Sequence, residues 1–376
     1  MKLTRLFIDQ ALTGKAGVSD GIADEIAAIA EKTGLTPEPV ADPAQVYDTI
    51  NQADEPIGFA KQVLFITANK GAIIRACPGT SHYTCCDYTI LHTGTFCTMD
   101  CSYCILQAYF HPPVLQYFAG LSTLTSALQP VFSGNDLLRI GTGEYTDSLI
   151  WEPVTPMPAF LVDQFSTQDR AVLELKTKTV NVSSLLEKNP QGKTILAWSV
   201  NTPEVIRAEE RGTASLTARL ETAKKCAAKG YRLAFHFDPL IIYQGCGPAY
   251  EAVIETIFTH VDPKDVVWIS LGTFRFMPQL KSVIQTRFPD SVIPFGEFIL
   301  GLDNKMRYFK PQRIRLYQRL AAKLKETAPG VFAYYCMEDQ EVWEKTFGFF
   351  PGKQGELAHL LNQAAVEKCG LDHGLL

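Results

Sequence analysis

Three cysteines stand close together between residues 97 and 104. They are Cys97, Cys101 and Cys104, separated by three and then by two residues, and charged residues are sparse in the surrounding stretch 90–110. Thiols at this spacing can bind three corners of a small iron–sulfur cluster, whereas a tetrahedral zinc ion would require a fourth protein ligand nearby. One iron would then stay open to a small molecule. The alternative, three ordinary reduced or zinc-binding cysteines, is disfavoured by the spacing and its context.

Short polar motifs follow two predicted strands downstream. The segment 139–144, Arg-Ile-Gly-Thr-Gly-Glu, places Gly143 and Glu144 directly after a strand, which allows a ligand to approach the backbone and offers an acceptor for an ammonium group. The next strand ends with Lys176 and Lys178 on one face, where either lysine can hold an anion. The alternatives are a plain tight turn and a solvated strand exit.

Two further strand ends carry polar side chains. Ser199 and Asn201 are small polar groups suited to contact a ribose or a carboxylate, and a helix cap is an equally good interpretation. His236 and Asp238 lie on the same face of a later strand. They could relay a proton, but we favour a hydrogen-bonded pair that braces the barrel mouth.

The chain after residue 87 alternates strand, loop and helix, which is typical of parallel βαβ units. About six such units predict an α/β fold with a partial (β/α)6 TIM-like barrel, whose functional side chains lie at the carboxyl ends of the strands. Residues 1–85 are predicted to form a mostly helical N-terminal extension with a strand at 62–68, 86–300 the barrel, and 301–376 a C-terminal hairpin and helix segment. The predicted barrel strands are 88–91, 137–140, 171–175, 194–199, 232–237, 266–271 and, less regularly, 291–295, with helices at 214–229 and 249–258.

Composition indicates an ordinary soluble globular protein. The chain has 376 residues, of which 46% are hydrophobic and 20% charged. No apolar run approaches the roughly 18 residues of a membrane-spanning helix, and no signal-peptide core follows the N-terminus, so we expect a cytoplasmic protein without a membrane partner. Cysteines in such a chain are expected to be reduced thiols or metal ligands. Outside the 97–104 loop we interpret them as structural thiols: Cys77, Cys85, Cys86, Cys226, Cys246, Cys336 and Cys369.

The net charge of −5 argues against a surface that binds polyanions generally, so any contact with nucleic acid must be local. The candidate is segment 305–319, which holds six basic residues and no acidic one. A competing interpretation is an amphipathic helix with Ile314, Leu316 and Leu320 buried and the basic residues exposed. For the arginines after residue 312 we favour the helix.

The cysteine loop, with the aromatic Tyr103 before its third cysteine, resembles the signature of radical S-adenosylmethionine enzymes. The segment 141–144 likewise resembles their Gly-Gly-Glu motif, which holds the methionyl amine. A larger set of motifs, in order and at similar spacings from about Cys77 to the C-terminus, resembles the spore photoproduct lyase family. These motifs are Cys97 to Gln107, Thr146-Asp147, Thr177-Lys178, Trp198-Ser199 and Lys305-Met-Arg307-Tyr308.

This resemblance implies a fold, cofactors and an activity. It implies a partial barrel that holds a [4Fe-4S] cluster and S-adenosyl-L-methionine, cleaves the latter reductively and abstracts hydrogen from a thymine-dimer lesion in DNA, returning two thymines. The implied partners are damaged DNA and a reductant such as a flavodoxin or ferredoxin. By position, Cys97, Cys101 and Cys104 would bind the cluster, Gly143, Glu144, Thr146, Lys178 and Ser199 would contact S-adenosylmethionine, and Arg307 and Tyr308 would lie on a hairpin that wedges into the duplex.

Two positions depart from the family pattern. The family returns hydrogen to the product radical from a cysteine shortly before the Thr-Asp pair, but this chain has no cysteine between Cys104 and Cys226. The family's tyrosine after the third cluster cysteine is Ile105 here. Either another group acts catalytically, the candidates being Tyr103, Tyr145 and Cys246, or the substrate radical is quenched differently, or the substrate is not that lesion. Two alternative functions remain: a radical enzyme acting on another nucleotide, a peptide or a small molecule, and a non-catalytic iron–sulfur DNA-binding protein.

Overall fold

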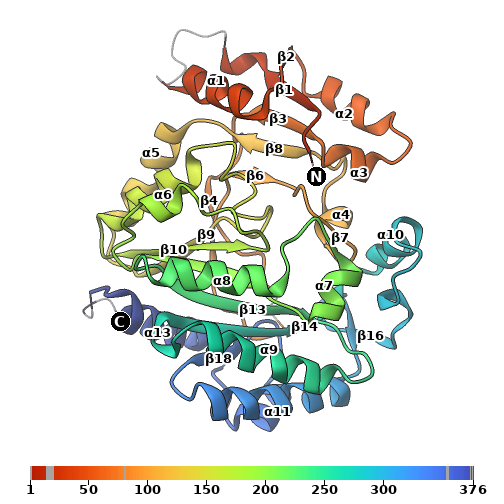
Figure 1. Ribbon diagram of the computed structural model, residues 1–376, viewed down its shortest axis with the longest axis vertical. Coiled ribbons are helices and arrows are strands. Elements are labelled where there is room, and N and C mark those ends of the chain that lie inside the picture. Colours follow the sequence, from red (N-terminus) through yellow and green to blue (C-terminus); the bar gives the residue numbers. More distant parts are fainter. Residues whose placement is uncertain (1, 14–20, 80–81, 353–354, 373, 375) are drawn as a thin grey trace.

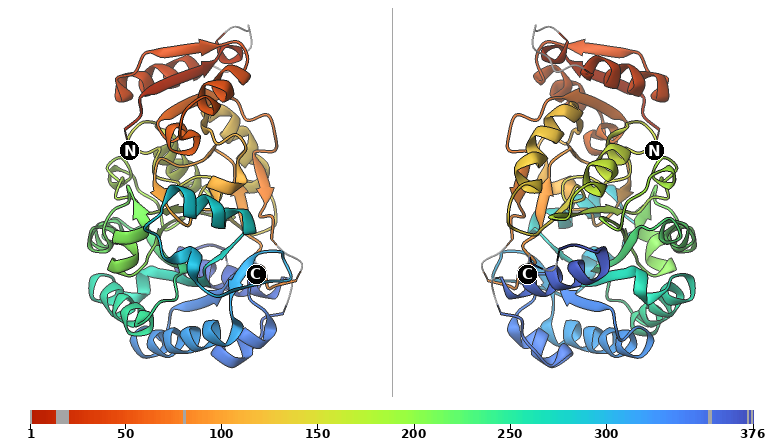
Figure 2. Two further views of the ribbon diagram at one scale, coloured as in Figure 1. Left: turned by 90° about the vertical axis from the view of Figure 1, so that its right-hand side faces the viewer. Right: turned by 90° about the vertical axis from the view of Figure 1, so that its left-hand side faces the viewer.

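The computed structural model describes residues 2–13, 21–79, 82–352, 355–372, 374 and 376. The molecule is elongated, with the N-terminal part at one end and the C-terminal helices at the other (Figure 1). The same order along the long axis is seen from both sides in Figure 2. Among the helices that the structure describes, none combines the length and apolar character needed to cross a bilayer.

A curled eight-stranded sheet forms the centre of the molecule, in the order β18-β14-β13-β11-β10-β9-β5-β4. All neighbouring strands are parallel except β4, which is antiparallel to β5. β11 and β14 are buried along their whole length, as expected for parallel strands covered on both faces. The strands are β4 (Ile74–Ala76), β5 (Thr89–Leu91), β9 (Leu138–Gly141), β10 (Ala171–Thr177), β11 (Thr194–Ser199), β13 (Arg232–Leu240), β14 (Val266–Thr273) and β18 (Phe332–Tyr335).

Helices cover the outer face of this sheet (Figure 1). α6 packs on β10, α8 on β11 and β13, and α13 on β14, while α11 contacts α9 and α12. Their apolar sides join one core in which all four tryptophans are almost completely buried. The helices are α5 (Leu121–Phe132), α6 (Met157–Ser166), α7 (Pro203–Glu209), α8 (Leu216–Ala227), α9 (Cys246–His260), α10 (Pro278–Arg287), α11 (Lys310–Thr327), α12 (Gln340–Phe347) and α13 (Glu356–Cys369), with 3-10 turns at Gln10–Leu12, Leu185–Glu187, Pro263–Asp265 and Ile293–Phe295.

The sequence analysis expected a mostly helical N-terminal part, but this part also contains a sheet. A second sheet, in the order β2-β1-β3-β8-β6, combines strands from before and after residue 85. β1 was missed because a short apolar run cannot be assigned by periodicity, and its buried residues pair with β3, which was predicted. The elements are β1 (Arg5–Asp9), β2 (Pro37–Val40), β3 (Val63–Thr67), β6 (Gly94–Thr95), β8 (Leu115–Phe118), α1 (Ile22–Thr33), α2 (Ala44–Asn51) and α3 (Pro56–Ala60).

Six of the predicted barrel strands are confirmed, and one is wrong. Residues 293–295 of the expected strand 291–295 form a 3-10 turn, because Pro294 cannot donate a ladder hydrogen bond. The edge position next to β14 is instead taken by β18, a strand of four residues that the sequence analysis did not predict.

A small three-stranded antiparallel sheet lies beside the carboxyl ends of the barrel strands. It has the order β15-β17-β16, and β17 contains Arg307 and Tyr308. α11 then begins at Lys310, with Ile314, Leu316 and Leu320 buried as predicted. The strands are β15 (Arg275–Phe276), β16 (Phe298–Leu300) and β17 (Met306–Tyr308).

Candidate active site

A cavity of about 680 Å³ opens at the carboxyl ends of the barrel strands. This is where a parallel barrel of this type places its functional side chains. The cysteine loop and the ends of β9, β10, β11 and β13 all contribute to its wall. Among the lining residues are Cys77, Cys97, Cys101, Tyr103, Cys104, Gly143, Glu144, Tyr145, Thr146, Asp147, Lys176, Lys178, Ser199, Asp238, Arg275 and Lys305.

The cysteine loop is anchored by the N-terminal part of the chain. Lys61 is 1% exposed, and its ammonium group donates to the carbonyl oxygens of Met99 at 2.6 Å and Cys97 at 3.3 Å. A short strand, β7 (Asp100–Cys101), pairs with β12 (Glu210–Arg211), which follows α7. The side-chain amide of Gln107, on α4 (Leu106–Tyr109), donates to the carbonyl oxygen of Cys101 at 3.0 Å. The loop is therefore held by backbone contacts on several sides.

The three cysteines fit an iron–sulfur cluster by their chemistry and shared cavity. Burial raises the pKa of Cys97 to about 12 and the pKa of Cys101 well above its usual value, so both remain thiols until a metal displaces the proton. Within the described part of the chain no three Cys, His, Asp or Glu side chains converge on a single ion. A four-iron cluster offers each thiolate a different iron atom, so its ligands need not converge in this way.

Tyr103 belongs to a buried hydrogen-bond network below the cavity. Its hydroxyl donates to the carboxylate of Glu210, which forms an ion pair of 2.5 Å with the buried Arg219. Arg219 also donates to the carbonyl oxygen of Ser199 at 2.8 Å. Because one guanidinium joins the aromatic position of the cysteine loop to the end of β11, Tyr103 and Ser199 are fixed relative to each other.

Asp147 clamps the end of β9 to the end of β10. Its carboxylate accepts from the backbone amides of Lys178 at 2.8 Å and Leu149 at 2.9 Å and from the hydroxyl of Thr177 at 2.9 Å. Burial raises the pKa of this carboxyl group, although all three donors favour its charged form. The sequence analysis named Thr146 and Lys178 for the site, and Asp147 is the residue that brings both to the cavity.

Two glycines, at the end of β9 and just after it, allow close packing of the backbone against neighbouring residues. A Cβ atom on Gly143 would lie 2.7 Å from the Cβ of Lys176, and one on Gly141 would lie 2.6 Å from the carbonyl oxygen of Glu174. The expectation that these glycines admit a ligand is therefore incomplete, because Gly143 makes room for β10, and Gly141 makes room for the side chain of Tyr88 as well as for β10. Glu144 does line the cavity, as predicted.

His236 and Asp238 do not pair with each other, so the predicted bracing pair is wrong. The ring of His236 contacts Glu174 at 2.5 Å and Ser270 at 2.9 Å inside the barrel. Asp238 instead accepts two hydrogen bonds from Arg275, at 3.2 and 3.0 Å, at the cavity. Alternation along a strand placed the two side chains on one face, but other strands supplied closer partners: β10 and β14 for His236, and β15 for Asp238.

Cys77 is the residue that the sequence analysis missed. We interpreted it as a structural thiol, but it lies at the end of β4 and lines the cavity together with Tyr145. Burial, reinforced by the Glu144 carboxylate, raises its pKa to about 12. Cys246, the cysteine named before, begins α9 and is not among the lining residues. Only the antiparallel pairing of β4 with β5, which no local pattern reveals, brings Cys77 to the site.

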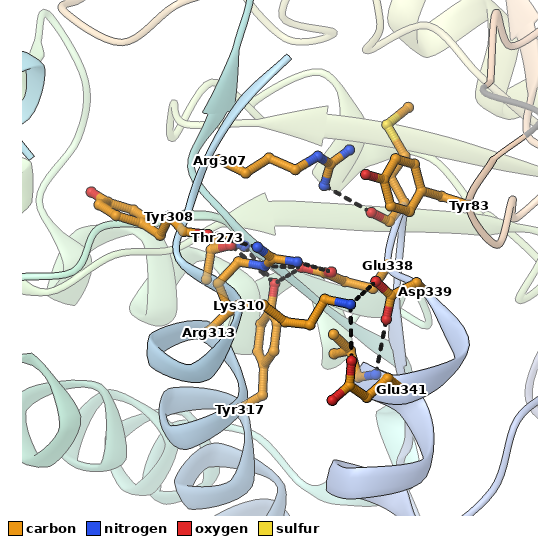
Figure 3. Close-up of polar contacts among 12 residues, drawn as sticks. Tyr83, Thr273, Arg307, Tyr308, Lys310, Arg313, Tyr317, Glu338, Asp339 and Glu341 are labelled. Atoms are coloured by element: carbon orange, nitrogen blue, oxygen red, sulfur yellow. Dashed lines mark hydrogen bonds and ion pairs between the residues drawn. The ribbon is translucent and has the colours of Figure 1, made fainter. Parts of the chain in front are cut away.

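Arg307 and Tyr308 lie on strand β17, which pairs antiparallel with β16, and both are buried (Figure 3). Arg307 forms an ion pair of 2.6 Å with Asp303, donates to the carbonyl oxygen of Met337 at 2.9 Å and lies over the ring of Tyr83. The ring of Tyr308 packs against that of Phe298 at a tilt of 33°, with ring centroids 4.7 Å apart. DNA binding by these two residues stays a prediction, but their contacts here hold the hairpin in place.

Arg313 is buried as well, contrary to the expected exposed face of α11. It forms two hydrogen bonds with Glu338, at 3.1 and 3.0 Å, and Tyr317 donates to the same carboxylate at 2.9 Å (Figure 3). Arg315 and Arg319 are exposed, as predicted for the helix. Within this basic segment, Lys305 alone reaches the cavity wall.

Comparisons with known proteins agree with this geometry. The family model for spore photoproduct lyase matches residues 58–327. Spore photoproduct lyase of Geobacillus sp. (strain Y412MC61) is 26% identical over 209 residues, which are 54% of this chain and 61% of that protein. Spore photoproduct lyase of Bacillus subtilis (strain 168) is 26% identical over 241 residues, 62% of this chain and 68% of that protein. The matched segment thus spans less than two thirds of the Geobacillus relative.

Solved structures show the same fold. A spore photoproduct lyase complexed with dinucleoside spore photoproduct superimposes with a TM-score of 0.75 at 20% identity, covering 89% of this chain and 98% of the other. A curled parallel half-barrel with three closely spaced cysteines at its mouth defines the radical S-adenosylmethionine class of fold. Since the family model covers more than half of its length, the chain belongs to the spore photoproduct lyase family.

Proposed function

We propose that this protein is a radical S-adenosylmethionine lyase that reverses a thymine-dimer lesion of the spore photoproduct type in DNA. The support is the convergence of three thiols, a set of polar strand ends and a fourth thiol, Cys77, on one cavity. The relatives are spore photoproduct lyases, and one solved neighbour is complexed with dinucleoside spore photoproduct. When bound, the cluster and S-adenosylmethionine would supply the carbon-centred radical that takes one hydrogen atom from the substrate.

The proposed cluster ligands are Cys97, Cys101 and Cys104. Lys61 and Gln107 hold the carbonyl groups of this loop, so that the thiols are presented without a large loss of conformational entropy when metal binds. Cys104 is the most exposed of the three and lies nearest to solvent. This arrangement leaves cavity space beside the loop for S-adenosylmethionine.

The proposed residues for S-adenosylmethionine are Gly143, Glu144, Thr146, Lys178 and Ser199, all of which line the cavity. Glu144 can accept hydrogen bonds from the methionyl ammonium group, and Lys178 can hold the carboxylate. Lys176 is a second cation here. Although burial alone would lower its pKa, the carboxylates of Glu174 and Glu144 raise the pKa of Lys176, so it stays charged.

Cys77 is the proposed hydrogen donor. It would replace the family's donor cysteine, which this chain lacks. Its S–H bond would break as a C–H bond forms on the product radical, leaving a sulfur-centred radical on Cys77. One electron from the low-potential reductant and one proton would restore the thiol. Hydrogen-atom donation requires the protonated thiol, and burial together with Glu144 keeps the pKa of Cys77 at about 12.

The test is repair by anaerobically reconstituted protein with lesion-bearing DNA. Wild-type protein should form 5′-deoxyadenosine and restore thymine. Cys77→Ala should still form 5′-deoxyadenosine, whereas thymine restoration should fall by about tenfold or more. Cys246→Ala, outside the cavity lining, should restore thymine normally. If the wild type formed 5′-deoxyadenosine but restored no thymine, this lesion would be rejected as the substrate. If Cys246→Ala formed 5′-deoxyadenosine but lost thymine restoration, Cys246 and not Cys77 would be the hydrogen donor.

A further inference from the structure

An aromatic cluster lies in the cavity wall, where α4 of the cysteine loop meets the segment that follows β9. The rings of Tyr109 and Tyr145 are stacked at an interplanar angle of 22°, with centroids 5.9 Å apart, and both residues line the cavity. Phe110 meets both rings edge-on. Tyr145 is further fixed because its carbonyl oxygen accepts from the backbone amide of Phe96 at 2.7 Å. We refer to Tyr109 and Tyr145 as the tyrosine stack.

The outer ring of this stack is open. Tyr109 is 53% exposed although it lies directly beside the cysteine loop, on the short helix α4. Ile105, 37% exposed, extends the same surface towards Cys104. A large, rigid aromatic side chain left uncovered at the mouth of a cavity suggests a flat partner, because a stacked ring gains contact area at little cost in side-chain entropy.

A cation, Arg75, and the carboxylate of Glu144 both act on Tyr145 of the tyrosine stack. The guanidinium of Arg75 lies 5.9 Å from the ring centroid of Tyr145. Among the described residues, the hydrogen bonds of its side chain go to the carbonyl oxygen of Ala72. Lys70 is exposed nearby in sequence, and His111 lines the same rim. Aromatic rings next to cations are the combination with which proteins hold unpaired nucleic-acid strands.

We propose that the tyrosine stack binds a nucleobase next to the lesion, in the unpaired part of the damaged strand, with Arg75 facing the adjoining phosphate. This inference rests on the proposed function, since it takes DNA as the substrate. A lesion that reaches the cavity must leave the base stack, which unstacks its neighbour on the strand. Tyr109 replaces that lost stacking partner. Base stacking of this kind tolerates any sequence.

The experiment measures binding of a short lesion-free oligothymidylate by fluorescence anisotropy, without reductant. Tyr109→Leu should weaken binding about tenfold, whereas Tyr109→Phe, which keeps the ring, should bind like the wild type. Arg75→Ala should weaken binding less and lower the slope of affinity against salt by about one phosphate contact. The matched control is Phe349→Leu, an aromatic residue 41% exposed that lines no part of the cavity; it should change nothing.

A second probe does not depend on the variants folding. Wild-type protein should bind an abasic oligonucleotide of the same length about tenfold more weakly than the oligothymidylate, and this preference should vanish in Tyr109→Leu. Equal binding of the two probes by the wild type would overturn the proposal. So would a Tyr109→Leu variant that loses affinity for S-adenosylmethionine but not for DNA, because the ring would then hold the adenine. Failure of lesion repair with these binding results intact would count against the proposed function alone.

Discussion

The active-site cavity and the basic segment 305–319 contain similar residues in opposite arrangements. At the cavity, Lys176, Lys178 and Arg275 share an open space with carboxylates. In the basic segment, Arg307 and Arg313 are buried in ion pairs with Asp303 and Glu338. A run of basic residues therefore says little about where its charges point. What separates the two regions is whether carboxylates close over the cations. Asp303 lies four residues before Arg307, whereas Glu338 meets Arg313 only through the tertiary structure. At the cavity, Asp238 pairs with Arg275, but Lys176 and Lys178 form no ion pair among the described residues.

The largest effect is expected at the cysteine loop. Cys101→Ala should abolish cluster assembly after anaerobic reconstitution, because it removes one of only three thiol ligands in the loop. Iron and sulfide content together with the visible absorbance spectrum measure this. Cys226→Ala is the matched control, a fully buried cysteine on α8 outside the cavity lining, and should keep its iron. Full iron content in Cys101→Ala would show that this loop does not hold the cluster.

Two arginines on α11, one buried and one exposed, are expected to contribute very differently to stability. Arg313→Ala leaves the Glu338 carboxylate buried without its partner, so the free energy of unfolding should fall by about 3–5 kcal/mol. Arg315→Ala, on the exposed face two residues later, should change it by less than about 0.5 kcal/mol. Urea unfolding measures both. Equal effects would mean that the basic segment is not divided into buried and exposed arginines as described.

Substitution of Arg307 examines whether this residue supports the hairpin or contacts DNA directly. Arg307→Ala removes the ion pair with Asp303 and the bond to Met337, and the free energy of unfolding should fall by about 2–3 kcal/mol. Affinity for duplex DNA, measured on the same folded sample, distinguishes the two interpretations of this residue. A variant of unchanged stability with a large loss of DNA affinity would favour direct contact over support of the hairpin.

The smallest effect is expected from His92, which is packed between Phe118 and Tyr145 beside the cavity. Neither ring nitrogen has a hydrogen-bond partner among the described residues. Burial, with the nearby Arg75, lowers its pKa from 6.5 to about 4. The unfolded chain therefore binds the proton more readily, and stability is lost as pH falls from about 6.5 towards 4.

In the His92→Phe variant, the free energy of unfolding should fall by about 1–2 kcal/mol less than in the wild type as the pH is lowered over this range. The difference is modest because the imidazole is partly exposed and solvent screens its charge. Melting temperatures of both proteins between pH 4 and 7 measure it. Parallel pH profiles for the wild type and the variant would show that His92 titrates normally in the folded protein.

Local patterns predicted much of the barrel and the residues at its strand ends. Buried parallel strands such as β11 and β14 are apolar throughout, and the polar residues that follow them mark the edge where the cavity opens. The three thiols were close in sequence and so required no knowledge of the fold. Thr146, Lys178 and Ser199 were carried over from a family resemblance, and the structure places them in one cavity.

The rest depended on contacts between distant segments. Cys77 reaches the cavity through the antiparallel pairing of β4 with β5, and Arg313 meets Glu338 only because the segment after β18 lies across α11. Apart from β3, which was predicted, the strands of the N-terminal sheet were too short for periodicity to distinguish them from buried helix. The segment 19–30 has a Ser/Asp start and apolar residues at helical spacing, which predict a helix. Its start at Ser19 lies outside the described residues, and α1 begins at Ile22.

Lys61 gives the N-terminal part a significance beyond its own fold. It is buried at the end of α3, and its ammonium group donates hydrogen bonds to two carbonyl oxygens of the cysteine loop. Residues on either side of the predicted boundary at 85 are thus coupled at the point where metal would enter. A barrel separated from this N-terminal part would keep its three cysteines but lose the lysine that holds the carbonyl oxygens of their loop.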